Sequence, residues 1–234
     1  MGKSWKNPIK AENAARKGAI FTKLAREIQV AAKLGGPDPE YNPRLRMALE
    51  AARKQSVPQD TIERAIKKGA GLIEGLEIEE VTYEGFGPHK VGIIVECQTD
   101  NRTRTVAEVR SLFKKYNGSL GETGSVSWMF ERIGLIEGTK EGSFDLEEEA
   151  IEAGANDVSK ASDGTCSFIT SPDSLDSVRQ ILSNRGWHLT KSELSYRPKT
   201  ISDLNDQQKQ EVYEFLNVLD EHDDTHRIHA TLSY

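Results

Sequence analysis

"AAKLGGPDPEYNPRLRMALEAARK", residues Ala31 to Lys54, joins two segments rich in Ala, Lys and Arg through a connector with two glycines and three prolines. Pro37, Pro39 and Pro43 each fix one backbone angle, whereas a flexible tether would need only Gly and Ser. The connector is therefore predicted to hold two basic helices at a set orientation.

Helical periodicity continues on both sides of this connector. Between Ala11 and Leu34, apolar residues recur at helical spacing and the cations fall on a different arc. Gly18 interrupts the pattern, so the helix is expected to begin or kink there. On the other side, Asn42 is typical of a helix N-cap and Pro43 of the first helical position.

A third helix is predicted to open around Pro58 and to stop at Gly69. Its apolar stripe consists of Ile62, Ala65 and Ile66. The three helices together predict a small basic helical bundle over residues 1–75.

Charge is unevenly distributed along the 234 residues, whose net charge is −6. Residues 1–75 carry 15 Lys and Arg against 8 Asp and Glu, which gives +7 and leaves −13 for residues 76–234. A basic block beside an acidic block predicts a protein that presents one end to a polyanion. An ordinary solvated helix surface is the alternative that charge alone leaves open.

Strand patterns begin after the glycine-containing linker that ends at Gly75. Residues 80–100 contain two apolar runs separated by Gly and Pro, which predicts a strand pair. A middle α+β domain is predicted over residues 76–133 plus 201–234. Residues 134–200 follow the ferredoxin-like order βαββαβ. The predicted class is α+β, with an N-terminal helical bundle and two α+β domains, the inserted one ferredoxin-like.

Neither a membrane span nor a secretory segment is expected. The longest apolar run, Val91 to Val95, is far shorter than the roughly 20 residues that a spanning helix needs. The charged N-terminus lacks an apolar signal region, so the cytoplasm is the expected compartment. Cys97 and Cys166 lie in apolar strand-like settings typical of reduced, buried thiols.

The common catalytic signatures are incomplete in this chain. "YEGFGPHK" lacks the third glycine and the following helix of a dinucleotide site. Gly118, Gly121 and Gly124 follow a helix and precede a strand, the reverse of a phosphate-binding loop, although their amides could still contact a phosphate. We therefore predict no catalytic residues and no cofactor. An enzyme using a groove between the α+β domains is the remote alternative.

His222, His226 and His229 are spaced so that a continuous helix would place them on one stripe, where they could bind a divalent metal. The apolar pattern of the last helix ends near Leu219, before these histidines. No metal site is predicted, and a role for the stripe stays open.

Four segments resemble the YebC/PmpR family of bacterial proteins, which is related to the mitochondrial translational activator of cytochrome c oxidase subunit I. They are "GAIFTKLAREIQVAAKLGGPDPEYNPRLRMALEAARKQSVPQDTIERAIKKG", "YEGFGP", "DNRTRTVAEVRSLFKKYNGSLGETGSVSWMF" and "LDEHDD". The resemblance runs from Gly18 to Asp224 in order. It implies three domains around a groove and no catalytic residues.

The resemblance also implies two functions. Members are commonly named probable transcriptional regulators, since some bind promoter DNA, and others resemble ribosome-associated translation factors that act on proline runs. The family's N-terminal pattern "GHSKWxNIKHRK" is only partly present, because this chain has "GKSWKNPIKAENAARK". A contact of the extreme N-terminus with nucleic acid is therefore in doubt.

The predicted function is a non-enzymatic nucleic-acid-binding regulator of gene expression, with duplex DNA as the first target and ribosomal RNA as the alternative. Phosphate contacts would position the protein without reading sequence. The acidic α+β domains would face protein partners or solvent. The predicted functional loop is Gly35, Gly36, Pro37, Asp38 and Pro39. The predicted phosphate-binding cations are Lys3, Lys6, Lys10, Arg16, Lys17, Lys23, Arg26, Lys33, Arg44, Arg46, Lys67 and Lys68.

Overall fold

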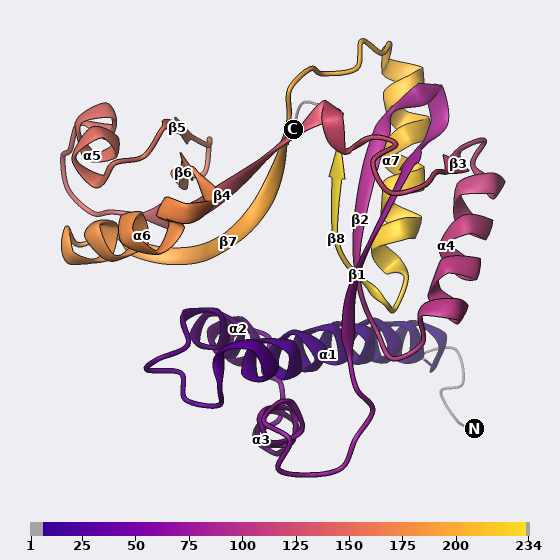
Figure 1. Ribbon diagram of the computed structural model, residues 1–234, viewed down its shortest axis with the longest axis horizontal. Coiled ribbons are helices and arrows are strands. Elements are labelled where there is room, and N and C mark those ends of the chain that lie inside the picture. The colour runs from indigo at the N-terminus through magenta and orange to yellow at the C-terminus, as the bar shows by residue number, and fades with distance from the viewer. Residues whose placement is uncertain (1–6, 233–234) are drawn as a thin grey trace. The chain divides into compact units, whose positions relative to one another are not determined.

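The computed structural model describes the backbone of residues 7–232 and the side chains of residues 17–232 (Figure 1). The chain divides into two compact units. The first contains the residues up to Val126 together with Asp203–Ala230, and the second contains Ser127–Ser202 and the residues from Thr231 onward. Each unit combines helices with an antiparallel sheet, which confirms the predicted α+β class.

Three helices open the first unit: α1 (Asn7–Gly35), α2 (Pro43–Lys54) and α3 (Gln59–Gly69). Both α2 and α3 pack against α1, and Ile28, Leu45 and Ile62 are buried where they meet. α1 runs without interruption through Gly18, so the expected start or kink at this glycine is wrong. A single exposed glycine costs a helix only about 1 kcal/mol, which the buried stripe that follows it outweighs.

A four-stranded antiparallel sheet in the order β3-β1-β2-β8 forms the other half of the first unit. β1 and β2 pair directly, as the predicted strand pair requires. The rings of Phe113 on α4 and Phe215 on α7 meet edge to face, with centroids 5.0 Å apart, and both side chains are fully buried. The bounds are β1 (Glu79–Phe86), β2 (Gly92–Thr99), α4 (Arg102–Lys115), β3 (Ser119–Leu120), α7 (Asp206–Glu221) and β8 (Thr225–Ala230).

The second unit has the order βαββαβ with a sheet arranged β5-β6-β4-β7, all antiparallel. Counted within the unit, this is the 4-1-3-2 strand order of the ferredoxin-like fold, as predicted. Phe168 and Trp187 pack edge to face in its core. The bounds are β4 (Phe130–Thr139), α5 (Leu146–Ala153), β5 (Asp157–Lys160), β6 (Cys166–Thr170), α6 (Leu175–Asn184) and β7 (His188–Pro198).

One of the domain boundaries predicted from the sequence falls within a strand. The predicted limit between residues 133 and 134 lies inside β4, whose pairing with β7 is continuous across it. The division into three domains stays a prediction. Cys97 and Cys166 are both free and buried. Within residues 7–232, no helix is long and apolar enough to cross a membrane.

Candidate nucleic-acid interface

Asn42 fixes the connector between α1 and α2. Its side-chain oxygen accepts from the backbone N–H of Leu45 at 3.0 Å and caps α2, as predicted. Its Nδ2 donates to the carbonyls of Ala31 and Gly36, each at 2.8 Å, and so satisfies the end of α1 as well. A Cβ at Gly35 would lie only 2.7 Å from that Nδ2, so glycine is required there. One buried amide thus ties both helices to the connector.

Arg46, on α2, holds the rest of the connector through hydrogen bonds. Arg46 donates from Nε to the carbonyl of Pro39 at 3.0 Å and from Nη2 to the carbonyl of Glu40 at 2.8 Å. Asp38 Oδ1 accepts from the Glu40 N–H at 2.9 Å, and Gly36 takes the left-handed region with φ +85°. Hydrogen bonds therefore supplement the prolines in making this connector rigid.

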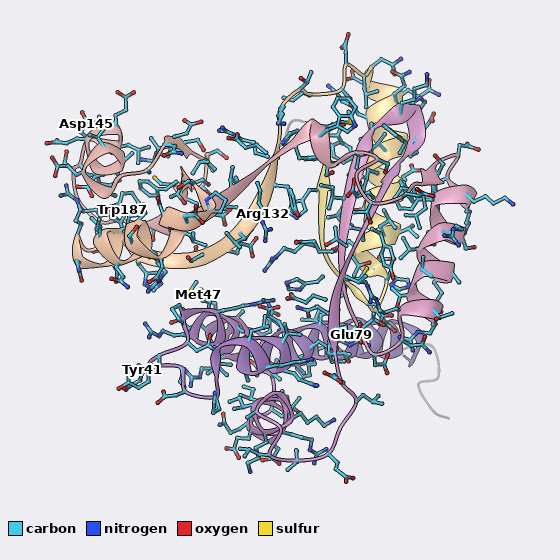
Figure 2. All side chains as sticks on the ribbon, in the orientation of Figure 1. Tyr41, Met47, Glu79, Arg132, Asp145 and Trp187 are labelled. Carbon is cyan, nitrogen blue, oxygen red and sulfur yellow. The ribbon has the colours of Figure 1, made fainter. Side chains whose placement is uncertain are left out.

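Tyr41 lies on this rigid connector and is exposed to solvent. Its side chain is 83% exposed, and Figure 2 shows it pointing away from the helices. An aromatic ring left in water on an ordered loop offers a flat face for stacking. The sequence reading did not single out Tyr41, and only its fixed exposure distinguishes it from a core aromatic residue.

Several of the predicted phosphate-binding cations of α1 are engaged inside the first unit. Lys23 donates from Nζ to the carbonyl of Asp220, near the C-terminus of α7. Arg26 donates from Nη1 to the carbonyl of Asp223 and to Oδ1 of Asp224, both at 2.7 Å. These contacts fasten α1 to the turn between α7 and β8.

Arg44 is also engaged internally, although it belongs to the short basic helix α2. Its guanidinium contacts Glu27 on α1 at 2.7 Å and Glu80 on β1 at 2.6 Å. Burial works to lower the pKa of Arg44, but the hydrogen bonds with Glu27 and Glu80 raise it overall, so the cation is permanent. Gln98 joins the same cluster by donating to Glu27 at 2.6 Å.

Four further predicted cations have distinct surroundings. The Lys33 ammonium lies 2.5 Å from the Glu77 carboxylate, and the Lys17 ammonium lies over the ring of Phe21 at 5.4 Å. Lys68 is half-buried, and a Cβ at Gly75 would lie 2.9 Å from its side chain. Lys67 is exposed.

Four predicted cations lie at or near the N-terminus. Lys3 and Lys6 fall outside the described residues. Lys10 and Arg16 belong to α1, and their side chains are outside the described part. Their contacts with nucleic acid stay predictions.

Several cations of α2 and α3 are exposed to solvent. Arg53 and Lys54 in the last turn of α2, with Arg64 and Lys67 on α3, are exposed and have no salt-bridge partner among the described side chains; we call these the α2–α3 cations. The sequence reading included only Lys67. The signal for Lys54 and Arg64 was their position opposite the buried stripes of their helices. Arg53 flanks its stripe, one turn after Leu49.

The two other motifs considered above have structural roles. The carboxylate of Glu84 accepts from the amides of Gly124 and Val126 at 2.9 Å, so these amides are occupied. His222 follows α7, whereas His226 and His229 lie on β8, and they approach Glu108, Glu27 and Glu96 respectively. The histidines therefore share no stripe. Among the described residues, no three His, Cys, Asp or Glu side chains are placed to hold one metal ion.

Comparison with protein-family models covers both units. The model of the TACO1/YebC protein N-terminal domain matches residues 3–72. The model of the TACO1/YebC second and third domain matches residues 78–232. The two models meet near the predicted limit of the helical bundle.

Individual relatives match along nearly the whole chain. "Probable transcriptional regulatory protein Bd1964" of Bdellovibrio bacteriovorus is 65% identical over 233 residues, which are 99% of this chain and 100% of the relative. A "probable transcriptional regulatory protein" of Pseudomonas syringae pv. tomato is 47% identical over 236 residues and covers 100% of both chains. The crystal structure of a conserved hypothetical protein, Aq1575, from Aquifex aeolicus matches with a TM-score of 0.84 and 43% identity, over 94% of this chain and 91% of that chain.

Proposed function

Because this chain belongs to the TACO1/YebC family, we propose that it is a non-enzymatic regulator of gene expression that binds nucleic acid through the α2–α3 cations. The observation that carries the proposal is that these cations are exposed without carboxylate partners in the described part of the chain, whereas Arg26 and Arg44 are neutralised internally. A cation that is free in water can replace the counterions of a phosphate backbone.

Duplex DNA is the first target of this proposal. The relatives' names, probable transcriptional regulatory proteins, favour it. Lys and Arg contacts to phosphates would fix the position of the protein on the duplex but would not read its sequence. The expected affinity is therefore strongly dependent on salt and weakly dependent on base sequence.

Structured RNA, as in the ribosome, is the second candidate, and one observation favours it. Tyr41 stands 83% exposed on a connector held by Asn42 and Arg46. Unpaired RNA bases stack on exposed aromatic rings, whereas bases in duplex DNA are already stacked on each other. An exposed ring on a rigid connector beside basic helices suits a target with unpaired bases.

The test is fractionation of a cell lysate at roughly 150 mM salt, where weak contacts between exposed charges are screened. The wild-type protein is compared with a variant carrying Arg64→Glu and Lys67→Glu. The control carries Arg110→Glu and Lys114→Glu, which reverse two exposed cations of α4. We expect the wild type and the control to be retained on nucleic acid and the α3 variant to be lost.

The fraction that retains the protein identifies the target. Retention on genomic DNA supports the transcriptional form, and sedimentation with ribosomes supports the RNA form. A wild-type protein that is retained by neither would contradict the proposed function. Equal loss of the two double variants would place binding elsewhere than on α3.

A further inference from the structure

A hollow of about 460 Å³ opens between the connector and α2. It is lined by Pro39, Glu40, Arg46, Leu49 and Arg53. It is shallow and open to solvent, so it would cover one side of a ligand without enclosing it. We propose that this hollow binds one unpaired nucleotide of the nucleic-acid target, with Arg53 on its phosphate.

The two arginines of the hollow differ in how many of their guanidinium N–H donors are free. Arg46 already bonds the carbonyls of Pro39 and Glu40, so it forms a fixed part of the wall. Arg53 is exposed and has no hydrogen-bond or salt-bridge partner among the described side chains. A guanidinium with free donors binds a phosphate through two parallel hydrogen bonds. Arg53 is therefore the phosphate ligand.

The apolar residues of the lining can contact the base or the ribose of a nucleotide. The ring of Pro39 contributes apolar surface, and Leu49, which is 5% exposed, adds a small area beside it. Two arginines against one glutamate leave a single net positive charge in the lining, which matches one phosphodiester rather than a polyphosphate.

The apolar Pro39 beside Arg53 favours an unpaired nucleotide over a duplex. In a duplex each base is stacked and paired, so only the sugar-phosphate edge could approach the hollow. A nucleotide turned out of a loop or a single strand can place its base or ribose against Pro39 and Leu49 while its phosphate contacts Arg53. The rigid connector keeps the hollow open without a ligand, because Asn42 and Arg46 hold it.

This inference rests on the proposed function and narrows its target to nucleic acid with an unpaired nucleotide. It is tested by NMR titration of the full chain with AMP, CMP, GMP and UMP, and with inorganic phosphate as a separate probe. The variants are Arg53→Gln and, as a matched control, Lys114→Gln. Each substitution removes one exposed cation near the C-terminus of a helix, α2 or α4, and Lys114 lies outside the proposed binding surface.

We expect mononucleotides to perturb the amides of residues 39–53 and Arg53→Gln to weaken their binding about tenfold or more, the usual effect of losing a hydrogen bond to a charged group. Lys114→Gln is expected to bind like the wild type. Equal weakening by the two variants, or inorganic phosphate binding as tightly as the nucleotides, would overturn the assignment.

A second measurement separates this inference from the proposed function: binding of a single-stranded RNA dodecamer and of a DNA duplex to the same proteins. If both polymers bind and Arg53→Gln binds mononucleotides like Lys114→Gln, the hollow is not a nucleotide site, and the proposed function stands. If neither polymer binds but mononucleotides bind through Arg53, the proposed function fails and the nucleotide site stands. If Arg53→Gln weakens the binding of single-stranded RNA more than that of duplex DNA, the result supports both the nucleotide site and the proposed function.

Discussion

Arg26 on α1 donates to the carboxylate of Asp224 across 2.7 Å, although the two residues are 198 positions apart in the sequence. Asp224 is 2% exposed, and its other oxygen accepts from Arg104 at 2.8 Å and from the hydroxyl of Thr105 at 2.7 Å. One buried carboxylate therefore joins α1, α4 and the turn before β8. Part of the basic charge of α1 thus serves the fold of the first unit.

The first prediction concerns this carboxylate. Asp224→Asn leaves the side chains of Arg26 and Arg104 without their charged acceptor, so we expect the free energy of unfolding to fall by about 2–3 kcal/mol. Urea denaturation measures the loss. The matched control is Asp223→Asn, whose exposed side chain should change stability by less than about 0.5 kcal/mol. Equal stability of the two variants would contradict the role of Asp224.

The wild type and Asp224→Asn also provide a test of pH dependence. Burial works to raise the pKa of Asp224, but hydrogen bonds from Arg104 and Thr105 lower it below its ordinary value of 3.8. A lowered pKa in the folded state contributes stability above the ordinary value and loses it as the pH falls through the folded value. The stability difference between wild type and Asp224→Asn should therefore shrink below about pH 4.

The second prediction separates the two hydrogen-bonding roles of the Asn42 side chain, as an acceptor that caps α2 and as a donor to the end of α1. Asn42→Asp keeps an acceptor for the Leu45 N–H but loses the Nδ2 donor to Ala31 and Gly36, whereas Asn42→Ala loses both. We expect Asn42→Ala to cost about 2 kcal/mol or more and Asn42→Asp to retain the α2 cap. Hydrogen exchange should show faster opening of residues 35–41 in both variants. Unchanged exchange in Asn42→Asp would show that the prolines suffice.

The third prediction concerns salt dependence. If Arg64 and Lys67 each neutralise one phosphate, the double variant Arg64→Gln, Lys67→Gln should reduce the slope of log affinity against log salt by about 2. Fluorescence anisotropy with labelled duplex DNA and single-stranded RNA measures the slope. The Arg110→Gln, Lys114→Gln control removes the same charge from α4 and should leave the slope unchanged. A similar change in both variants would indicate a net-charge effect instead.

The fourth prediction concerns Glu149 in the second unit. Hydrogen bonds from Arg185, from the Trp187 indole N–H and from Lys140 reach its carboxylate, and with Arg185 as the main cause they lower its pKa to about 2. We expect Glu149→Gln to destabilise this unit by about 2 kcal/mol at pH 7, because the buried Trp187 indole and the partly buried Arg185 and Lys140 lose a charged acceptor.

The direction in which the stabilising contribution of Glu149 changes with pH follows from its lowered pKa. The contribution of Glu149 is full above its ordinary pKa of 4.5 and declines as the pH falls toward 2. Thermal unfolding at pH 7 and at pH 2.5 should therefore show a smaller difference between wild type and Glu149→Gln at the lower pH. The neighbouring Glu148→Gln, on the exposed side of α5, is the control and should behave like the wild type at both.

Local patterns were sufficient for most of the architecture. The spacing of apolar residues predicted α1, α2 and α3, the strand pair β1–β2 and the order of the ferredoxin-like unit, because periodicity reports which face of an element is buried. The N-cap at Asn42 was predicted from its own residue type and its neighbour Pro43. Gly18 was misread, since a local propensity of about 1 kcal/mol is smaller than the packing of a whole helix.

The roles of individual charges depend instead on tertiary contacts. By itself, the sequence determined that residues 1–75 are basic and helical and that the remainder is acidic. Only the tertiary structure decided that Arg26 and Arg44 pair with carboxylates inside the first unit while Arg53 and Arg64 stay free among the described side chains. Helical spacing places a cation on a face, but whether that face meets a carboxylate or water depends on residues up to 198 positions away.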